Sequence, residues 1–239
     1  MRVDNPATPR IIAHRGASGI APENTLAALR AAATAGARWA EVDVQSSSDG
    51  VLVLVHDDTW QRTAGLNRDV AACPWEVVRR LDVGAWFATA FRGEAVPTLD
   101  DVLDFAHDDL HLDLEIKSPQ NHADLGPRVL AAIRRHDAFD RVLCTCFDAD
   151  VVEALASDEP RLHCGYLSAI TVERRHPRIR TYAIHSAALQ AAPDWITRVR
   201  AEGGTVWAWT VDEPDEVQAL ARLGVEAVIT NRPERLRPD

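Results

Sequence analysis

The sequence predicts a TIM-type (β/α)8 barrel of the α/β class, with a small inserted cap segment after the second strand. Eight short apolar runs alternate with stretches of helical periodicity, an alternation typical of parallel sheets covered by helices. The 239 residues suit such a barrel as one unit, so we expect a single domain over 1–239. A doubly wound open sheet is the alternative, but no glycine-rich phosphate loop follows the first run.

Each expected strand is a short apolar run with turn residues at its ends. The runs are 10–14, 39–44, 110–116, 141–146, 161–166, 180–185, 205–210 and 226–230. Expected helices with suitable caps cover 24–35, 99–107, 123–135, 149–157, 193–202 and 213–223. Gly36, Gly203 and Gly224 fall where helix C-termini need a residue that tolerates the left-handed conformation.

One segment interrupts this alternation. After the second run, the chain makes a serine-rich turn that ends in Asp49 and Gly50, and it returns through the apolar run 51–55. The next segment, about 57–97, has no clear repeat and is the expected insertion. Its aromatic residues suit a small cap on the mouth of the barrel. They are Trp60, Trp75, Trp86, Phe87 and Phe91.

Composition and charge exclude several classes of protein. With 36 acidic and 26 basic residues, the net charge is -10, which argues against nucleic acid or an anionic membrane as the partner. No apolar run reaches the roughly 18–20 residues of an integral membrane segment. The first ten residues lack the apolar part of a secretory signal. The four cysteines have no C-x-x-C spacing, so we expect reduced thiols in a cytoplasmic protein.

Two of the expected strands carry polar residues at alternate positions, which places these residues on one face of each strand. The polar residues are Glu41 and Asp43 in the second strand, and Asp113, Glu115 and Lys117 in and just after the third. If the apolar residues between them face the helices, the polar side chains point to the barrel axis near the C-terminal strand ends. Barrel enzymes build their active sites there. The deepest carboxyl, Asp113, is expected to form buried hydrogen bonds.

A divalent metal explains the convergence of Glu41, Asp43 and Glu115. Unpaired carboxylates are costly to bury together. Ligand sets made only of oxygen favour Mg²⁺ or Ca²⁺ over zinc. The alternative is a metal-free site in which Arg15 and Lys117 neutralise the carboxylates.

Two histidines and two cations join this rim. His14 ends the first strand and precedes Arg15, and His56 follows the returning run. Histidine transfers protons near neutral pH, so one ring can accept a proton while the other donates one to a leaving oxygen. Arg15 and Lys117, the only lysine among 26 basic residues, suit contacts to a phosphate. Together these groups predict cleavage of a phosphoester.

A series of short motifs runs along nearly the whole chain. They are His14-Arg-Gly, Glu23-Asn-Thr, Glu41-Val-Asp-Val, Asp49-Gly, His56-Asp, Arg62-Thr, Pro97-Thr-Leu, Leu114-Glu-Ile-Lys, Trp209-Thr-Val and Val228-Ile-Thr-Asn-Arg-Pro. Their order resembles that of the glycerophosphodiester phosphodiesterases, in the phosphatidylinositol-specific phospholipase C-like phosphodiesterase superfamily. The resemblance implies a hydrolase of lipid and glycerol metabolism. It would convert glycerophosphodiesters such as glycerophosphocholine or glycerophosphoethanolamine to sn-glycerol 3-phosphate and an alcohol.

The resemblance also implies roles for individual residues. It makes His14 and His56 the acid/base pair, Glu41, Asp43 and Glu115 the ligands of Ca²⁺ or Mg²⁺, and Arg15 and Lys117 the phosphate contacts and further catalytic groups. As in related phospholipases, the glycerol 2-hydroxyl is expected to attack phosphorus and give a cyclic phosphate that water then opens.

The surroundings of this set are expected to support it. Asn24 is expected to cap the helix that follows it, and Glu23 or Thr25 to support the metal site or bind glycerol hydroxyls. Trp209 and Phe147 end strands and are expected to bind substrate. Trp209 suits a wall for the glycerol or a site for a cationic head group such as choline. Plain packing is the alternative for Trp209.

Three residues depart from the family pattern, and two other functions are alternatives to glycerophosphodiester hydrolysis. Ser47, Cys146 and Asn231 stand where the family usually has Thr, Ser and Asp. One rival is a lysophospholipase D-type or sphingomyelinase D activity, which needs an apolar groove near the mouth. Another is a catalytically silent phosphodiester-binding barrel, which the intact set of histidines, carboxylates and cations disfavours. The expected partner is a small-molecule glycerophosphodiester, and the sequence leaves a homodimer open.

Overall fold

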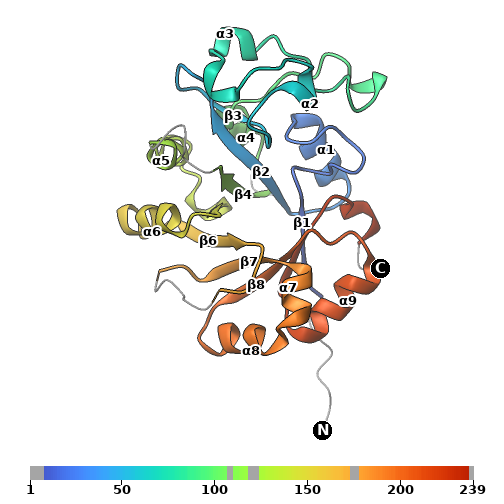
Figure 1. Cartoon of the computed structure of the whole chain (residues 1–239), viewed down its shortest axis with the longest axis vertical. Helices are drawn as coiled ribbons and strands as arrows, with labels where there is room; N and C mark the ends of the chain where they lie inside the picture. Colours follow the sequence, from blue (N-terminus) through green and yellow to red (C-terminus); the bar gives the residue numbers. More distant parts are fainter. Residues whose placement is uncertain (1–7, 107–109, 118–123, 173–177, 237–239) are drawn as a thin grey trace.

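Eight parallel strands close into a barrel, which confirms the predicted fold class (Figure 1). The structure is a computed structural model that describes residues 8–106, 110–117, 124–172 and 178–236. The barrel strands are β1 (Arg10–Ala13), β2 (Trp39–Ser46), β4 (His111–Ile116), β5 (Val142–Cys146), β6 (His163–Ser168), β7 (Thr181–His185), β8 (Thr205–Trp209) and β9 (Ala227–Thr230). Strand β1 pairs with both β2 and β9, so the first and last strands seal the sheet.

Helices pack on the outside of the barrel, mostly where the sequence predicts them (Figure 1). They include α1 (Leu26–Thr34), α4 (Leu99–Phe105), α5 (Leu125–Arg135), α6 (Ala149–Asp158), α8 (Pro193–Ala201) and α9 (Pro214–Leu223). The predicted ends at 107 and 123 lie outside the described residues. Gly224 ends α9 with φ +97°, as its position after the last helical residue predicts. No helix in the described part of the chain is long and apolar enough to cross a membrane.

Several element ends differ from the prediction by one or two residues; β2, for example, continues to Ser46. Strand β6 begins at His163 and not at 161, because the Glu159 carboxylate binds both the backbone N–H and the guanidinium of Arg161 and holds this residue in a turn. An unexpected short helix, α7 (Ser186–Ala191), follows β7. Its N-terminus is capped by His185, whose Nδ1 accepts a hydrogen bond from the backbone of Ala187 at 3.3 Å.

Alternation along the strands separates two apolar cores. The outward-facing residues of β2 and β4 join the large core under the helices, as predicted; they include Ala40, Val42, Val44, Leu112, Leu114 and Ile116. A smaller core fills the barrel interior with Ile12, Leu143, Leu167, Ala183, Trp207, Ala227 and Ile229. Full burial of one large apolar side chain contributes about 1.5–3 kcal/mol. This packing fixes the strands whose C-terminal ends carry the polar residues.

The segment between β3 (Leu52–Leu54) and α4 has a small core of its own. Strand β3 runs antiparallel to β2, and two short helices follow, α2 (Gln61–Ala64) and α3 (Trp75–Val78). The core of this segment contains Val53, Val55, Trp60, Val70, Cys73, Val78, Val83 and Val96. Trp60, one of the aromatics expected at the barrel mouth, is therefore buried inside the segment, whereas Trp86 is 40% exposed.

Candidate active site

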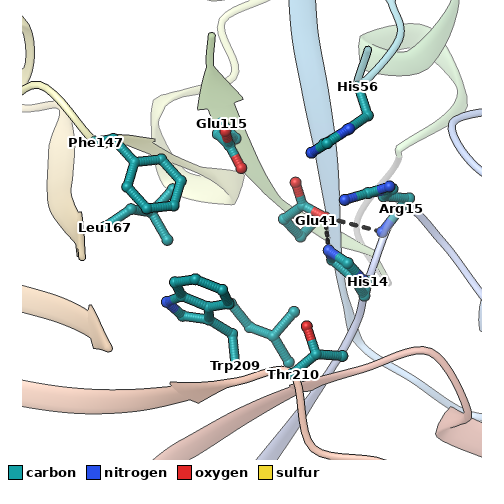
Figure 2. A pocket seen from close by; sticks show the side chains of 10 residues that line it. His14, Arg15, Glu41, His56, Glu115, Phe147, Leu167, Trp209 and Thr210 are labelled. Atoms are coloured by element: carbon teal, nitrogen blue, oxygen red, sulfur yellow. Dashed lines mark hydrogen bonds and ion pairs between the residues drawn. The ribbon is translucent and has the colours of Figure 1, made fainter. Parts of the chain in front are cut away.

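A solvent-open pocket of about 460 Å³ lies at the C-terminal ends of the barrel strands (Figure 2). It is lined by His14, Arg15, Glu41, His56, Glu115, Phe147, Leu167, Trp209, Thr210 and Ile229. Figure 2 shows the histidines and carboxylates on one side of the pocket and Phe147, Leu167 and Trp209 on the other. Most of the site residues predicted from the sequence thus meet here. Asp43 and Lys117 are not among the lining residues, but they contact ones that are.

Three carboxylates converge at the polar side of the pocket. One oxygen each from Glu41, Asp43 and Glu115 lies within 4.8 Å of the others. The strand register brings them together, because Asp43 on β2 is the direct neighbour of Glu115 on β4. Burial and the charges of Asp43 and Glu115 raise the pKa of Glu41 well above its usual value. A carboxyl in this position is ionised only if a cation compensates it.

The two nearby cations compensate the cluster incompletely. The Lys117 ammonium lies 2.7 Å from Glu115 Oε1 and 3.4 Å from Asp43 Oδ1, and Arg15 Nε lies 3.2 Å from Asp43 Oδ2. Burial opposes ionisation of Asp43, but Arg15 and Lys117 outweigh it and hold the pKa of Asp43 below its usual value. Glu41 forms no ion pair with a lysine or an arginine in the part of the chain that the structure describes; it accepts the backbone N–H of Arg15 at 2.9 Å, and the charge of Arg15 offsets the rise of its pKa only in part.

The free oxygens of the cluster fit a hard divalent cation. Glu41 Oε1 and Asp43 Oδ1 are buried, and neither has a hydrogen-bond partner among the described residues, although Asp43 Oδ1 has the ion pair with Lys117 at 3.4 Å. Buried carboxylate oxygens without partners are costly, and oxygen-only sets are the ligands that Ca²⁺ and Mg²⁺ prefer. The metal-free alternative requires Arg15 and Lys117 to neutralise all three carboxylates. Within the residues that the structure describes, these two cations form ion pairs within the cluster only with Asp43 and Glu115.

A tight turn aims Arg15 at this cluster. Arg15 has φ +54° and Gly16 has φ +77°, both in the left-handed region. A Cβ on Gly16 would lie 2.6 Å from the backbone of Ala28, so only glycine fits between the turn and α1. The strained Arg15 backbone is held by its N–H to Glu41, drawn dashed in Figure 2. This explains why the turn after His14 reads Arg-Gly.

His14 is oriented from the far end of the chain. Its Nδ1 lies 2.7 Å from Oδ1 of Asn231, which follows β9. The Asn231 amide is fixed because its Nδ2 donates to Asp212 at 2.8 Å, while its Oδ1 also accepts from the Ser18 hydroxyl. The assigned amide orientation therefore places the proton on Nδ1 of His14 and leaves Nε2 unprotonated, 3.9 Å from Glu41 Oε2. Burial and the charge of Arg15 lower the pKa of His14.

His56 has a different partner. It follows β3, and its Nδ1 lies 2.9 Å from Oδ1 of Asp57. The group beside Nδ1 is therefore a carboxylate at His56 and a neutral amide at His14. Figure 2 shows the His56 ring directed into the pocket toward Glu41. The sequence singled out both histidines, but it did not show that their partners differ. Only the His-Asp dipeptide pointed to the partner of His56.

The expected roles of Asn24 and Thr25 are corrected by the structure. Thr25 caps α1, because its hydroxyl accepts from Ala28 N at 3.2 Å. Asn24, with φ +57°, instead turns its side chain to β2, where Nδ2 donates to Asp43 Oδ2 at 2.7 Å and Oδ1 accepts from Asp43 N at 3.0 Å. Glu23 supports Arg15 with a hydrogen bond of 2.8 Å. Asn24 therefore holds a member of the carboxylate cluster.

The apolar side of the pocket is built from strand ends. The rings of Phe147 and Trp209 meet edge to face at 5.7 Å, and Trp209 Nε1 donates to Ala183 O at 3.0 Å. Phe147 is 44% exposed. The sequence missed the other lining residues on this side, Leu167 and Ile229, although each lies on the inward face of its strand. No tryptophan of the insertion lines this pocket.

Asp113 lies beneath the carboxylate cluster, as expected. It is fully buried and accepts a hydrogen bond from the Thr145 hydroxyl at 2.8 Å. Burial, opposed by that hydrogen bond, raises its pKa to about 8. It is therefore neutral in the folded protein at pH 7.

Comparison with known proteins gives consistent similarities. Residues 14–235 match the Glycerophosphoryl diester phosphodiesterase family. A glycerophosphodiester phosphodiesterase of Caldanaerobacter subterraneus is 32% identical over 231 residues, which cover 95% of each chain. An Oleispira antarctica phosphodiesterase, solved in complex with the product sn-glycerol-3-phosphate, superposes with a TM-score of 0.89 at 27% identity, covering 96% of this chain and 95% of that one. A glycerophosphodiester phosphodiesterase from Agrobacterium tumefaciens gives a TM-score of 0.83 at 28% identity, covering 95% and 98%.

Proposed function

The chain belongs to the glycerophosphoryl diester phosphodiesterase family and is a glycerophosphodiester phosphodiesterase, and from this premise we propose its substrates and mechanism. We propose that it hydrolyses deacylated phospholipids such as glycerophosphocholine or glycerophosphoethanolamine to sn-glycerol 3-phosphate and an alcohol. The reaction depends on Ca²⁺ or Mg²⁺ and on acid/base catalysis by His14 and His56. The observation that carries the proposal is that both histidines face one pocket beside a carboxylate cluster.

Glu41, Asp43 and Glu115 are the proposed metal ligands, on the strength of their spacing and free oxygens. When bound there, a divalent cation supplies a Lewis acid for a phosphoryl oxygen and stabilises negative charge in the transition state. Arg15 and Lys117, whose side chains border the cluster, are placed to neutralise the phosphate as substrate enters. In the structure both cations contact carboxylates, so binding of phosphate exchanges part of these contacts.

His14 is the proposed general base. Its proton lies on Nδ1 toward Asn231, and Nε2 is free to accept a proton from the attacking hydroxyl. The lowered pKa of His14 keeps this nitrogen unprotonated near neutral pH. The attacking group is the glycerol 2-hydroxyl of the substrate. Its oxygen forms a bond to phosphorus as its proton passes to His14.

His56 is the proposed general acid. The Asp57 carboxylate fixes the ring through Nδ1, and the Nε2 proton of the protonated ring passes to the alcohol oxygen as its bond to phosphorus breaks. The product of this step is a cyclic glycerophosphate. In the second step water opens the ring, with the proton transfers reversed between the two histidines. A single-turnover reaction quenched early should contain the cyclic phosphate, and its absence would contradict the two-step route.

The apolar wall suits the glycerol or the leaving alcohol. Phe147 and Trp209 present ring edges and faces to the pocket opposite the carboxylates. A quaternary ammonium such as choline is attracted to an aromatic face. The four cysteines are free and buried, which suits the proposed location in the cytoplasm. The proposed reaction belongs to lipid and glycerol metabolism.

Release of sn-glycerol 3-phosphate from glycerophosphocholine tests the proposal. The protein is treated with EDTA, and Ca²⁺ or Mg²⁺ is then restored. We expect release only with metal, and little release of product from lysophosphatidylcholine, because the insertion tryptophans do not extend the pocket with an apolar groove. Release from the lysolipid alone would favour the lysophospholipase D activity. Metal-independent release would contradict the assigned role of the carboxylates.

A further inference from the structure

One guanidinium in the insertion holds two carboxylates at once. Arg62, on α2, donates to Asp57 through Nε at 2.7 Å and through one terminal nitrogen at 2.8 Å. It also donates to Glu23 through both terminal nitrogens, at 2.7 and 2.9 Å. Arg62 thus forms a two-point contact with each carboxylate. This use of its donors needs the planar fork of arginine.

The first of these carboxylates leads to His56. Asp57 Oδ1 accepts from both Arg62 and the imidazole Nδ1 of His56. Hydrogen bonds from Arg62 are the largest cause of a strongly lowered pKa at Asp57. Asp57 therefore stays ionised and presents one fixed oxygen to the ring. Without Arg62, the half-exposed Asp57 side chain is free to rotate and the ring loses its fixed orientation.

The second carboxylate leads to Arg15. Glu23 Oε1 accepts from Arg62 and from Arg15, in the latter case at 2.8 Å. Glu23 is nearly buried, and burial alone would raise its pKa, but the hydrogen bonds from Arg62 and the charge of Arg15 outweigh that effect. Arg15 in turn contacts the buried Asp43. A displaced Glu23 therefore leaves Arg15 attached to the carboxylate cluster alone.

We propose that Arg62 is a positioning residue that sets the geometry of His56 through Asp57 and of Arg15 through Glu23. The inference deepens the proposed function, since it rests on His56 as the acid and Arg15 as the phosphate contact. The insertion then completes the active site of the barrel without touching substrate. Trp86 covers the guanidinium, with the Cζ of Arg62 5.5 Å from the ring centre.

A folding role alone does not account for this arrangement. The Arg62 side chain is 40% exposed, and exposed ion pairs contribute little to stability. Each of its four hydrogen bonds goes to a carboxylate that also binds a proposed active-site group. Arg62 loses mobility when it forms these hydrogen bonds, and the two carboxylates it binds are thereby held in one orientation. Orientation matters here because small displacements of a reacting group lower rates steeply.

The test compares two substrates that differ in the leaving group. Glycerophosphocholine needs a proton on its departing alcohol, whereas the p-nitrophenyl ester of glycerol 3-phosphate releases a weakly basic phenolate that does not. For Asp57→Asn we expect kcat to fall about 10- to 100-fold on glycerophosphocholine and less than about threefold on the p-nitrophenyl ester. For Glu23→Gln we expect similar losses on both substrates, with a raised KM.

Arg62→Met should combine the two patterns, with a loss on both substrates that is larger on glycerophosphocholine. Arg62→Lys keeps the charge but not the fork, so it should behave like Arg62→Met in kcat while unfolding at the wild-type temperature. The matched control is Arg79→Met, another half-exposed arginine of the insertion, whose hydrogen bond goes to Glu76. We expect wild-type kinetics for this control.

The outcomes separate the inference from the proposed function. If wild type hydrolyses glycerophosphocholine and Arg62→Lys keeps wild-type kcat, or loses equally on both substrates, the positioning role is overturned while the function stands. If wild type itself releases no sn-glycerol 3-phosphate with metal present, the proposed substrate is wrong. A loss in Arg62→Lys that matches a fall in folded fraction, measured by circular dichroism, would also reject positioning.

Discussion

The barrel and the insertion hold the two proposed catalytic histidines in different ways. His14, at the end of β1, is 19% exposed and bonded to the neutral amide of Asn231. His56, at the start of the insertion, is 37% exposed and bonded to the carboxylate of Asp57. The two imidazoles thus have chemically different partners at Nδ1, a neutral amide and a carboxylate. The difference shows that two identical side chains acquire different surroundings: burial and the charge of Arg15 lower the pKa of His14, whereas a carboxylate holds Nδ1 of His56.

Removing either imidazole should give the largest loss of activity. His14→Ala and His56→Ala should each lower kcat on glycerophosphocholine by at least about a hundredfold, the usual scale of acid/base catalysis. On the p-nitrophenyl ester only His14→Ala should keep its full loss. The unfolding temperatures should stay near wild type. Near wild-type rates for both variants would reject the acid/base assignment.

Glu41→Gln separates a metal ligand from a structural carboxylate. We expect the Ca²⁺ or Mg²⁺ concentration for half-maximal activity to rise at least about tenfold, because a ligand is lost. The metal-free protein should unfold at the same or a higher temperature, since burial and like charges disfavour the ionised Glu41. Isothermal titration with metal and thermal melts in EDTA measure both effects. A destabilised variant with unchanged metal dependence would mean that Glu41 is structural.

Asn231→Asp makes the partner of His14 resemble that of His56. In wild type the lowered pKa of His14 places the acidic limb of kcat/KM below pH 6.5, because the base must be neutral and is lost as the pH falls through its pKa. A carboxylate at Nδ1 should move that limb up by about one pH unit. A pH profile from 4.5 to 8 measures the shift. An unmoved limb would mean that the partner does not set the base.

Asp113→Asn tests whether a carboxyl buried inside the barrel is neutral in the folded protein. The pKa of Asp113 is about 8 in the folded protein and lower when unfolded, so wild type loses stability as the pH rises from about 4 to 8. The variant lacks this loss, so its stability relative to wild type should be about 3–4 kcal/mol higher at pH 8 than at pH 5. Urea unfolding in EDTA at both pH values measures the difference. An equal change at both would contradict a neutral Asp113.

The sequence was sufficient for the barrel because apolar runs alternate with helical stretches along the chain, and for the carboxylate cluster because polar and apolar residues alternate within a strand. Glu41 and Asp43 share a face wherever β2 lies, and the apolar residues between them define which face is outside. The start of β6 was misplaced because a local side-chain contact, Glu159 with Arg161, overrides the apolar run. Strand periodicity carries no information about such a contact.

The hydrogen-bond partners of the proposed site residues were harder to predict from the sequence. The Asn24 side chain has a capping residue's chemistry, but Thr25 takes the cap and Asn24 reaches β2. The role of Asn231 depends on a contact between residues 217 positions apart, which exists only when the barrel closes. Motif order located both residues, and only the three-dimensional structure shows what they bind.

The seam between β1 and β9 has a consequence for the synthesis of the protein. His14 donates its backbone N–H to Thr230 and its ring contacts Asn231, so a residue at the end of the barrel's first strand is oriented by one that is translated 217 positions later. A nascent chain still lacking β9 has an open sheet and a histidine without its partner. On the proposed mechanism, hydrolysis waits until residue 231 has left the ribosome, although the carboxylates, Arg62 and His56 are already translated, so catalytic competence arrives in a single late step.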